Sequence, residues 1–281
     1  MKKIIFVLSV AFYAGAIACL PDVYDKDYRD EAAYEDQDYS YYALAYNEVY
    51  ILTENGEITT SASQTDSIEL GLRLSATGYS DADAEEHLAE IDVEIDADSA
   101  GEILRVSVYI PTDYKRDYGC DVTLKLPDSV FVDLETTNGE VNSSGHSNGL
   151  NVFTSNGKIE ITNTAGYADL ETSNGEIEVS RHTGKIEGET SNGAITADVV
   201  MPVNDGYSRF ESSNGRISVA IPDSTGAEVT LRTSLGSIDI IGLNVTVTSQ
   251  DETYLEGSMG SGTGIIYLKT SNGDVTLEKL P

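Results

Sequence analysis

The sequence contains no tryptophan and only three histidines, His87, His146 and His182, among its 281 residues. The histidines are far apart along the chain and have no cysteine or serine partner at the spacing of a catalytic or metal-binding motif. We therefore predict no metal, no cofactor and no Ser-His-Asp triad. Polysaccharide-cleaving enzymes on parallel β-helices use aromatic platforms, and here Phe153 is predicted to be nearly alone as an exposed aromatic residue.

Basic residues are also scarce: 17 lysines and arginines stand against 48 acidic residues, which gives a formal net charge of −31. A body this acidic repels phosphate backbones, so nucleic acid is excluded as a partner. It also repels anionic lipid, so membrane attachment would need a covalent anchor rather than a basic surface. The charge favours solubility and cationic partners.

The N-terminus has the layout of an export signal. Lys2 and Lys3 precede an apolar run from Ile4 to Ile17, which is too short for a transmembrane helix of roughly 20 residues. Residues 1–18 are therefore predicted to be a signal peptide cleaved after Ala18.

Two modes of cleavage fit this signal. Ala16-Ile17-Ala18-Cys19 resembles a bacterial lipobox, in which Cys19 receives the lipid and becomes the mature N-terminus, although Ala16 replaces the usual leucine. The same residues also fit an A-x-A site for ordinary signal peptidase. The position of Cys19 at the end of the apolar run favours lipid attachment.

The second cysteine, Cys120, shares its strand phase with Val122 and Leu124 and should face the apolar side of a strand. We interpret it as a small buried hydrophobic residue. A Cys19–Cys120 disulfide, which an oxidising compartment would allow, is the alternative.

Residues 19–47 are dense in Asp, Glu and Tyr and have no apolar period. Such a composition is typical of disorder. We predict an extended tether that lifts the following body off the membrane.

Asn-Gly pairs recur through the rest of the chain. They recur every 18 residues from Asn138 to Asn192, and Leu235-Gly236 replaces one of the later pairs. Glycines nine residues apart give each unit two turns, and a glycine at a fixed position is typical of a positive φ angle. The structural repeat corners are predicted at Asn138, Gly139, Asn156, Gly157, Asn174, Gly175, Asn192, Gly193, Asn214, Gly215, Asn272 and Gly273.

Between corners, apolar and polar residues alternate with the period of a β-strand. Asn-Gly between such runs is also the strongest short hairpin signal, so an antiparallel meander is one alternative. Identical residues at identical phase favour parallel coils instead, because stacking places the asparagines in one column where their amides can bond. The predicted fold is all-β, a single-chain parallel β-solenoid of about eight coils of ~18 residues over residues 129–281.

Residues 48–128 are predicted to cap the N-terminal edge of this array. Residues 49–56 match the repeat template, residues 80–90 suit a short helix with Ala84, Leu88 and Ile91 on one side, and strands follow at residues 104–110 and 122–126. At the C-terminal end of the array, the 37 residues before Asn272 are predicted to contain one additional coil whose repeat sequence is degenerate. The strand that ends at Pro281 is predicted to close the stack.

Glu171, Glu189 and Glu211 occupy the same phase, so stacking would form a carboxylate column that divalent cations can bridge weakly. The alternative is a solvated face, which the opposite charges at Glu187/Arg209 and Glu211/Arg232 favour. The corners lack the G-G-x-G-x-D pattern of calcium-binding β-rolls, which argues against a calcium-dependent fold.

Several of these motifs together resemble a known family. They are Leu126-Pro127-Asp128-Ser129 before the first coil, the tandem Glu171-Thr172-Ser173-Asn174-Gly175-Glu176-Ile177 units and the closing Thr270-Ser271-Asn272-Gly273-Asp274-Val275. With the lipoprotein-type signal, they resemble a bacterial family of unknown function that carries a provisional adhesin label, over about residues 48–281. The resemblance implies a β-solenoid in an envelope protein, and it implies little about mechanism because the label is itself an analogy of fold.

We therefore expect a non-enzymatic cell-envelope lipoprotein at the outer membrane or cell surface. Its adhesin-like body would present a binding or scaffolding surface to a glycan or to an envelope or surface protein. One alternative is a periplasmic envelope sensor or assembly factor. Another is a polysaccharide-acting β-helix enzyme, because outward carboxylate pairs such as Glu187 and Glu189 are the groups such chemistry needs.

Overall fold

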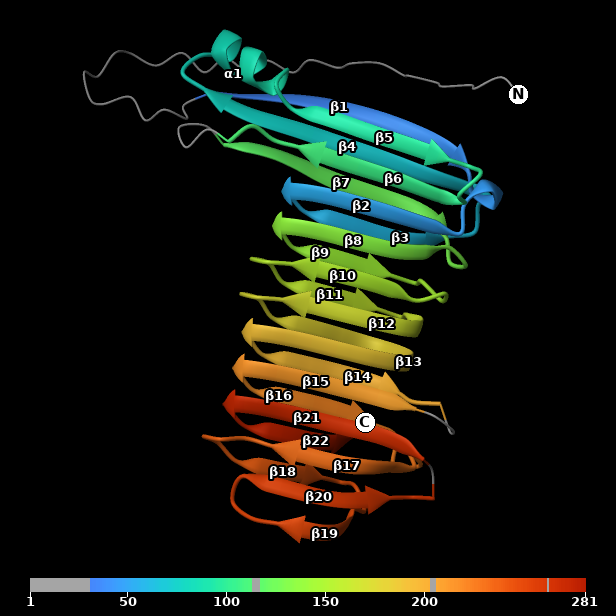
Figure 1. The fold of residues 1–281 in the computed structure, drawn as a ribbon, viewed down its shortest axis with the longest axis vertical. Helices are drawn as coiled ribbons and strands as arrows, with labels where there is room; N and C mark the ends of the chain where they lie inside the picture. Colours follow the sequence, from blue (N-terminus) through green and yellow to red (C-terminus); the bar gives the residue numbers. More distant parts are fainter. Residues whose placement is uncertain (1–30, 113–116, 203–205, 262) are drawn as a thin grey trace, which may run out of the picture.

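The computed structural model describes residues 31–112, 117–202, 206–261 and 263–281. The chain forms an elongated stack of β-strands with one α-helix near its N-terminal end (Figure 1). The prediction of an almost entirely β protein is confirmed.

The strands pair in two series, which we name the first and second sheets. In order across the stack, the first sheet contains β5 (Asp92–Asp98), β6 (Ile103–Tyr109), β2 (Glu48–Asn55), β8 (Phe131–Asn138), β10 (Leu150–Thr154), β12 (Ala165–Thr172), the second half of β13 (Ile177–Asn192), β15 (Tyr207–Asn214), β21 (Gly264–Asn272), β17 (Ala227–Arg232), β20 (Tyr254–Met259) and β19 (Thr246–Gln250). Its pairings are parallel from β6 to β17 and antiparallel at both ends.

The second sheet has the same organisation. It contains β1 (Glu31–Tyr42), β4 (Ser67–Gly78), β7 (Tyr118–Pro127), β3 (Ile58–Ser63), β9 (Val141–Ser144), β11 (Ile159–Thr162), the first half of β13, β14 (Ile195–Val200), β16 (Ile217–Ile221), β22 (Val275–Lys279) and β18 (Ile238–Ile241). Its pairings are parallel from β7 to β18 and antiparallel from β1 to β7. Because β13 turns the corner between the sheets, it belongs to both.

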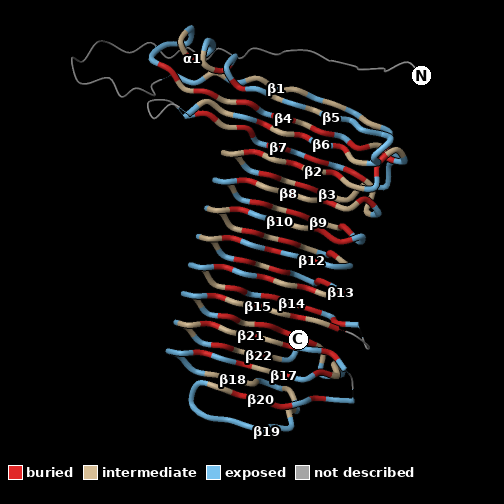
Figure 2. The backbone as a smooth tube through the Cα atoms, viewed as in Figure 1, coloured by how far each residue is buried: buried red, intermediate tan, exposed pale blue. Residues whose placement is uncertain are grey.

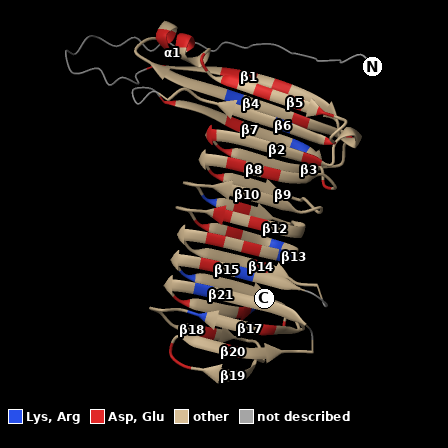
Figure 3. Cartoon of the chain, in the orientation of Figure 1, with Lys and Arg blue, Asp and Glu red and all other residues tan. Residues whose placement is uncertain are grey.

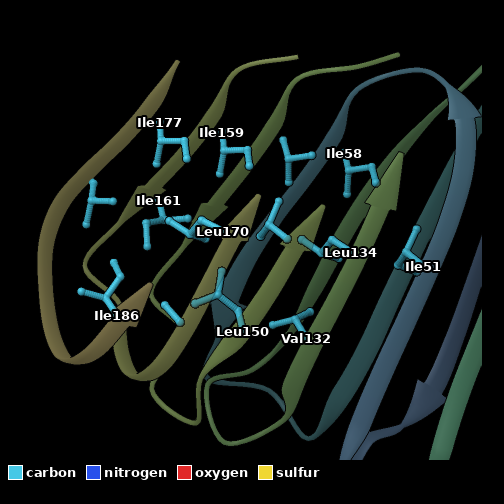
Figure 4. Packing of buried hydrophobic residues seen from close by; sticks show 14 of the residues in the cluster. Ile51, Ile58, Val132, Leu134, Leu150, Ile159, Ile161, Leu170, Ile177 and Ile186 are labelled. Carbon is cyan, nitrogen blue, oxygen red and sulfur yellow. The ribbon is translucent and has the colours of Figure 1, made fainter. Parts of the chain in front are cut away.

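Alternation along most strands, β19 excepted, sends every second side chain into one continuous core (Figure 2). Figure 4 shows Ile58, Ile159 and Ile177 in one row of that core, on strands from different parts of the chain. These three isoleucine side chains are fully buried. Burial of an isoleucine side chain stabilises the fold by about 1.5–3 kcal/mol. The core runs without a break through the predicted cap (residues 48–128) and the predicted repeat array (residues 129–281). The boundary expected between residues 128 and 129 therefore marks no break in packing.

The asparagines of the repeat corners form a ladder of side-chain amide hydrogen bonds. Asn156 donates from Nδ2 to Oδ1 of Asn138 at 2.8 Å, and Asn174 donates in the same way to Asn156 at 2.9 Å. The ladder runs from Asn55 through Asn138, Asn156, Asn174, Asn192 and Asn214 to Asn272. Leu235 takes the next position and is 70% exposed.

Beside this ladder, buried hydroxyls bond to the glycine carbonyls of the neighbouring coil. Thr172 donates to the carbonyl oxygen of Gly157 at 3.0 Å, and Thr190 donates to that of Gly175 at 3.0 Å. A Cβ atom on Gly175 would lie 1.8 Å from the Gly157 oxygen. The expectation that these corner glycines need positive φ is therefore wrong for Gly157 and Gly175, because close approach of backbones excludes a side chain there. The expectation is confirmed at Gly166 and Gly184 in the opposite corner, and at Gly273 in this one.

The ends of the stack are interlocked. β2 and β3 form a coil that lies between β6 and β7 on one side and β8 and β9 on the other. At the opposite end, β21 and β22 lie between β15 and β16 on one side and β17 and β18 on the other. Each end therefore contains a coil that fills a space between coils distant from it in sequence.

Two expectations about the C-terminal end are corrected by this arrangement. The residues before Asn272 do not form a degenerate coil, because β19 and β20 pair antiparallel with each other and β20 pairs antiparallel with β17. The final strand, β22, does not close the stack, because it has a partner on both sides. Figure 1 accordingly places the C-terminus partway along the stack.

The predicted tether is wrong for residues 31–47, while its residues 19–30 lie outside the described residues. β1 pairs antiparallel with β4 along its whole length. Its side chains alternate, so that Tyr39 and Tyr41 pack against the core while Asp36 and Asp38 are exposed. Two inward tyrosine rings and continuous backbone pairing with β4 along one edge stabilise this strand despite its acidic composition.

Helix α1 (Asp81–Leu88) lies within the residues predicted to be helical. Ser80 caps it by accepting a hydrogen bond from the Asp83 amide at 3.3 Å, and Ala84 and Leu88 are buried. Cys120 is a free and fully buried thiol, and burial raises its pKa to about 12.

Candidate functional site

The outward side chains of the first sheet form the most distinctive surface of the molecule. We name it the aromatic–acidic face, and it comprises Tyr50, Phe131, Asp133, Glu135, Phe153, Tyr167, Asp169, Glu171, Lys185, Glu187, Glu189, Tyr207, Arg209, Glu211, Tyr267 and Lys269 on β2, β8, β10, β12, β13, β15 and β21. Figure 3 shows acidic positions along β8, β12 and β13 and basic positions farther along the stack.

In the parallel part of the stack beyond β7, aromatic rings distinguish the two sheets, although β1 and β7 at the N-terminal end of the second sheet do carry tyrosines. The strands of the second sheet from β3 to β18 contain no aromatic residue in the described part of the chain. On the first sheet, Phe153 is 36% exposed and Tyr167 is 41% exposed, and Phe131 and Tyr207 are partly exposed nearby. The expectation that Phe153 is nearly alone is therefore wrong. The alternation of inward and outward positions along the strands predicts this exposure, because all of these aromatic residues occupy outward positions before or within repeat strands.

Carboxylates are neighbours across the strands of this face. Asp169 lies opposite Glu187, and Glu171 lies opposite Glu189, at an inter-strand spacing of about 4.8 Å. Burial, and then the charges of Glu187 and Glu189, raise the pKa of Asp169. The negative charges therefore repel one another on this part of the surface.

A similar environment surrounds Asp133 on β8. Burial raises the pKa of this carboxyl, and the neighbouring charges of Glu48 and Glu135 raise it further.

Two tyrosines are fixed by carboxylates of the same face. Tyr50 donates its hydroxyl to Glu135 at 2.8 Å, and Tyr167 donates to Glu187 at 3.0 Å. Burial raises the pKa of each hydroxyl to about 12, and the hydrogen bond to the carboxylate contributes. Both tyrosines are therefore neutral donors with oriented rings at physiological pH.

The face supplies its own cations toward the C-terminal end. Nη1 of Arg209 lies 3.7 Å from Glu187, its Nη2 bonds to Glu211, and its guanidinium carbon lies 5.8 Å from the centre of the Tyr267 ring. Lys269 also contacts Glu211 at 3.1 Å.

The predicted neighbour of Glu211 was Arg232. The structure instead places Lys269 between them, because β21 inserts between β15 and β17.

Glu171, Glu189 and Glu211, the predicted cation column, are neighbours in the strand register. Glu211 differs from the other two because Arg209 and Lys269 already neutralise it. Among the residues that the structure describes, no group of three or more His, Cys, Asp or Glu side chains is arranged to hold a metal ion.

The three histidines do not come together. His87 lies on α1 and contacts Glu90 and Tyr118, whereas His146 and His182 are buried at corners of the stack. His146 bonds through Nε2 to the Thr60 hydroxyl at 3.0 Å, and His182 bonds through Nδ1 to Thr164 at 3.0 Å. Ala18 and Cys19 lie outside the described residues.

A groove of about 870 Å³ lies on the outer side of the second sheet, over β1, β4, β7 and β3. Gly71 forms part of its floor, and Asp36, Asp38, Glu69 and Asp121 line it together with Arg73 and Lys125. Arg73 stacks over the Tyr34 ring at 5.0 Å. Acidic and basic groups are mixed here, whereas the aromatic–acidic face over β8, β10, β12 and β13 has Lys185 against six carboxylates.

These stacked strands and repeat corners define a β-solenoid-like protein. Residues 99–278 match the profile of the Toastrack DUF4097 family. The match covers more than half of the chain, and the chain belongs to that family. No curated protein matches it. Within the described residues, α1 is far too short and polar to cross a bilayer, and no other helix qualifies.

Solved structures that are similar to this chain come from several bacteria. A protein of Clostridium sporogenes, provisionally named for cell adhesion, is similar over 88% of this chain and 100% of its own, with 10% identity and a TM-score of 0.41. A provisionally named adhesin of Bacteroides fragilis is similar over 89% and 98%, with 16% identity and a TM-score of 0.38. A protein of Parabacteroides distasonis provisionally named for lipid binding is similar over 88% and 97%, with 11% identity and a TM-score of 0.26.

Proposed function

We propose that the protein is a non-enzymatic, adhesin-like envelope protein, exported and anchored through a lipid on Cys19. Its body would present the aromatic–acidic face to a partner in adhesion or scaffolding. The observation that carries this proposal is the one-sided gathering of aromatic rings in the parallel part of the stack. There they are present on the first sheet and missing from the described strands β3, β9, β11, β13, β14, β16, β22 and β18 of the second.

Aromatic residues are the side chains most enriched at protein interfaces, because they supply large contact areas at small entropic cost. Exposed rings such as Phe153 and Tyr167 have no evident role in folding, since their strands are already anchored by buried residues such as Val152 and Leu170. A surface that keeps such rings in water is most simply explained by a partner that covers them.

In this proposal the body is a parallel β-solenoid of single-chain coils. Its N-terminal end is closed by β1, β4, β5 and α1. The parallel registers between β6 and β17 and the amide ladder support a stiff scaffold. Stiffness suits presentation, because a rigid face loses little entropy when it binds.

The test uses beads coated with the full mature chain carrying Cys19→Ser, and flow cytometry counts their attachment to bacterial cells and isolated envelopes. We expect Phe153→Ser with Tyr167→Ser to lower attachment about tenfold. The control is Thr196→Ala with Ser218→Ala on the second sheet, which should leave attachment unchanged. Equal attachment of all three proteins would refute the role of this face.

Anchoring is tested separately. Metabolic labelling with a clickable fatty acid should mark the wild type and not Cys19→Ser. Protease treatment of intact cells should remove the body if it faces outward, whereas a periplasmic sensor or assembly factor would survive. Labelling of both chains alike would contradict lipid attachment at Cys19.

A further inference from the structure

Arg209 shows how a cation is held on the aromatic–acidic face. Its guanidinium lies between the carboxylates of Glu187 and Glu211 and close to the Tyr267 ring. Arginine suits such a site because its planar group bonds to carboxylates and stacks on aromatic rings at the same time. The chain repeats the combination elsewhere, where Arg232 lies 4.9 Å from the centre of the Tyr254 ring beside Glu256.

The same elements recur nearer the N-terminus, where Lys185 lies opposite Tyr167 and Arg209 reaches Glu187, but where three of the carboxylates have no cation of the protein's own among the described residues. Across β12 and β13, Asp169 faces Glu187 and Glu171 faces Glu189, with Tyr167 on the same strand and Phe153 on the neighbouring strand β10. Among the described residues, no ion pair involves Asp169, Glu171 or Glu189. The exposed rings and the mutually repelling carboxylates therefore form a surface complementary to guanidinium groups.

We propose that the part of the face over β8, β10, β12 and β13 binds an arginine-bearing, extended segment of a partner protein. Its guanidinium groups would take the place that Arg209 takes one coil farther along. The inference rests on the proposed function and names the chemistry of its partner. A docked guanidinium would relieve the repulsion between Glu171 and Glu189 and would cover the rings of Phe153 and Tyr167.

A neutral glycan fits the same surface less well. Its hydroxyls could bond to the carboxylates and its rings could stack on Phe153, but it would desolvate several acids without neutralising any of them. A free metal ion fits less well too, because the described carboxylates are not gathered into a metal-binding group.

Fluorescence anisotropy of a labelled arginine–glycine peptide against the full mature Cys19→Ser chain tests this proposal. We expect binding that weakens with added salt and is tighter than that of the matching lysine–glycine peptide. Glu171→Gln with Glu189→Gln should weaken it about tenfold. Phe153→Ser should reduce the preference for arginine over lysine, because lysine gains less from stacking.

The matched control removes the same number of charges from the other sheet. Asp38→Asn with Glu69→Gln, in the groove over β1 and β4, should leave the affinity within about twofold. Because all four acids are exposed, both double variants should fold, and equal thermal midpoints would verify this.

Three outcomes would overturn the inference. Equal weakening by the two double variants would assign binding to net charge alone. Equal affinity for the arginine and lysine peptides would remove the role of the rings. Binding of a neutral oligosaccharide that needs Phe153 but not Glu171 and Glu189 would assign the face to glycans. If bead attachment depends on the face while the peptide does not bind, the proposed function stands and only the ligand class is wrong.

Discussion

Asn138 donates its side-chain amide to Oδ1 of Asn55 at 2.7 Å, although 83 residues separate them in sequence. The bond continues the ladder that joins Asn138 to Asn156, whose separation is 18 residues. Local and distant neighbours thus make the same contact. The coil that contains Asn55 is therefore part of the repeating stack, and the chain returns to it only after building β4–β7.

The amide ladder predicts a modest and localised loss of stability on truncation. Asn174→Ala removes the bonds to Asn156 and Asn192, both 2.9 Å long. Because net hydrogen-bond contributions are about 0.5–1.5 kcal/mol each, we expect a loss of about 1–2 kcal/mol in the free energy of unfolding. Urea denaturation measures it, with Ser191→Ala at an exposed corner position as the control. A loss no larger than that of the control would mean that the ladder contributes nothing.

The corner glycines predict a sharp contrast between two Gly→Ala variants. At Gly175 an added Cβ would lie 1.8 Å from the Gly157 oxygen, whereas at Gly71 the nearest atom would be a side-chain oxygen of Asp38 at 3.4 Å. We expect Gly175→Ala to cost more than about 4 kcal/mol, since backbones must separate. Gly71→Ala should be neutral or stabilising by about 0.5 kcal/mol, because alanine suits a strand better than glycine. Similar thermal midpoints for the two variants would contradict the close approach of coils.

Sequence periodicity could predict contacts within the regular part of the stack, because Asn138, Asn156 and Asn174 recur at one spacing and one phase. It could not predict where the chain leaves that order. Asn272 bonds to Asn214 across 58 residues, and no local spacing encodes that β21 inserts between β15 and β17. The position of that coil depends on a gap that exists only in the assembled structure.

Part of the candidate site could be predicted from the sequence. Glu171, Glu189 and Glu211 were expected in one column and are neighbours in the register, but the role of Lys269 beside Glu211 depends on the inserted coil. The exposed aromatic rings of the first sheet could have been predicted from the alternation of inward and outward strand positions, but not from the identity of each residue taken alone. Acidic composition similarly concealed β1, where Tyr39 and Tyr41 alternate with exposed acids.

The buried histidine at residue 146 predicts acid sensitivity. Burial lowers the pKa of His146 from its ordinary value of 6.5 to about 4, because the interior penalises the charged ring. The unfolded chain therefore binds a proton that the folded chain does not between these pH values. Stability from this residue is complete above pH 6.5 and is lost as the pH falls toward about 4, by about 3 kcal/mol.

His146→Gln tests this directly. Denaturation of both chains between pH 8 and pH 4 gives the difference in free energy of unfolding, in which the titrations of the carboxylates cancel. At pH 8 both side chains are neutral, so the difference there measures packing alone. We expect the wild type to lose stability relative to the variant on acidification. Parallel curves would show that His146 does not titrate in this range.

The interlocked C-terminus predicts an unusual response to truncation. In an ordinary repeat array the last unit contacts one neighbour, so its removal leaves the rest folded. Here residues 264–279 pair with coils on both sides, and Leu268 and Leu277 are fully buried between them. A chain ending at Ser261 would leave an empty coil space and four exposed strand edges.

We expect that truncated chain to be insoluble or to be digested rapidly under limited proteolysis. A chain that lacks only Leu280 and Pro281, which follow the last strand, is the control and should match the full chain in protease resistance. The peptide 262–281 added in trans should restore resistance to the truncated chain if the gap is the cause. A truncated chain as resistant as the control would mean that the coils on either side can close against each other, and the inserted coil would then be an appendage rather than a lock.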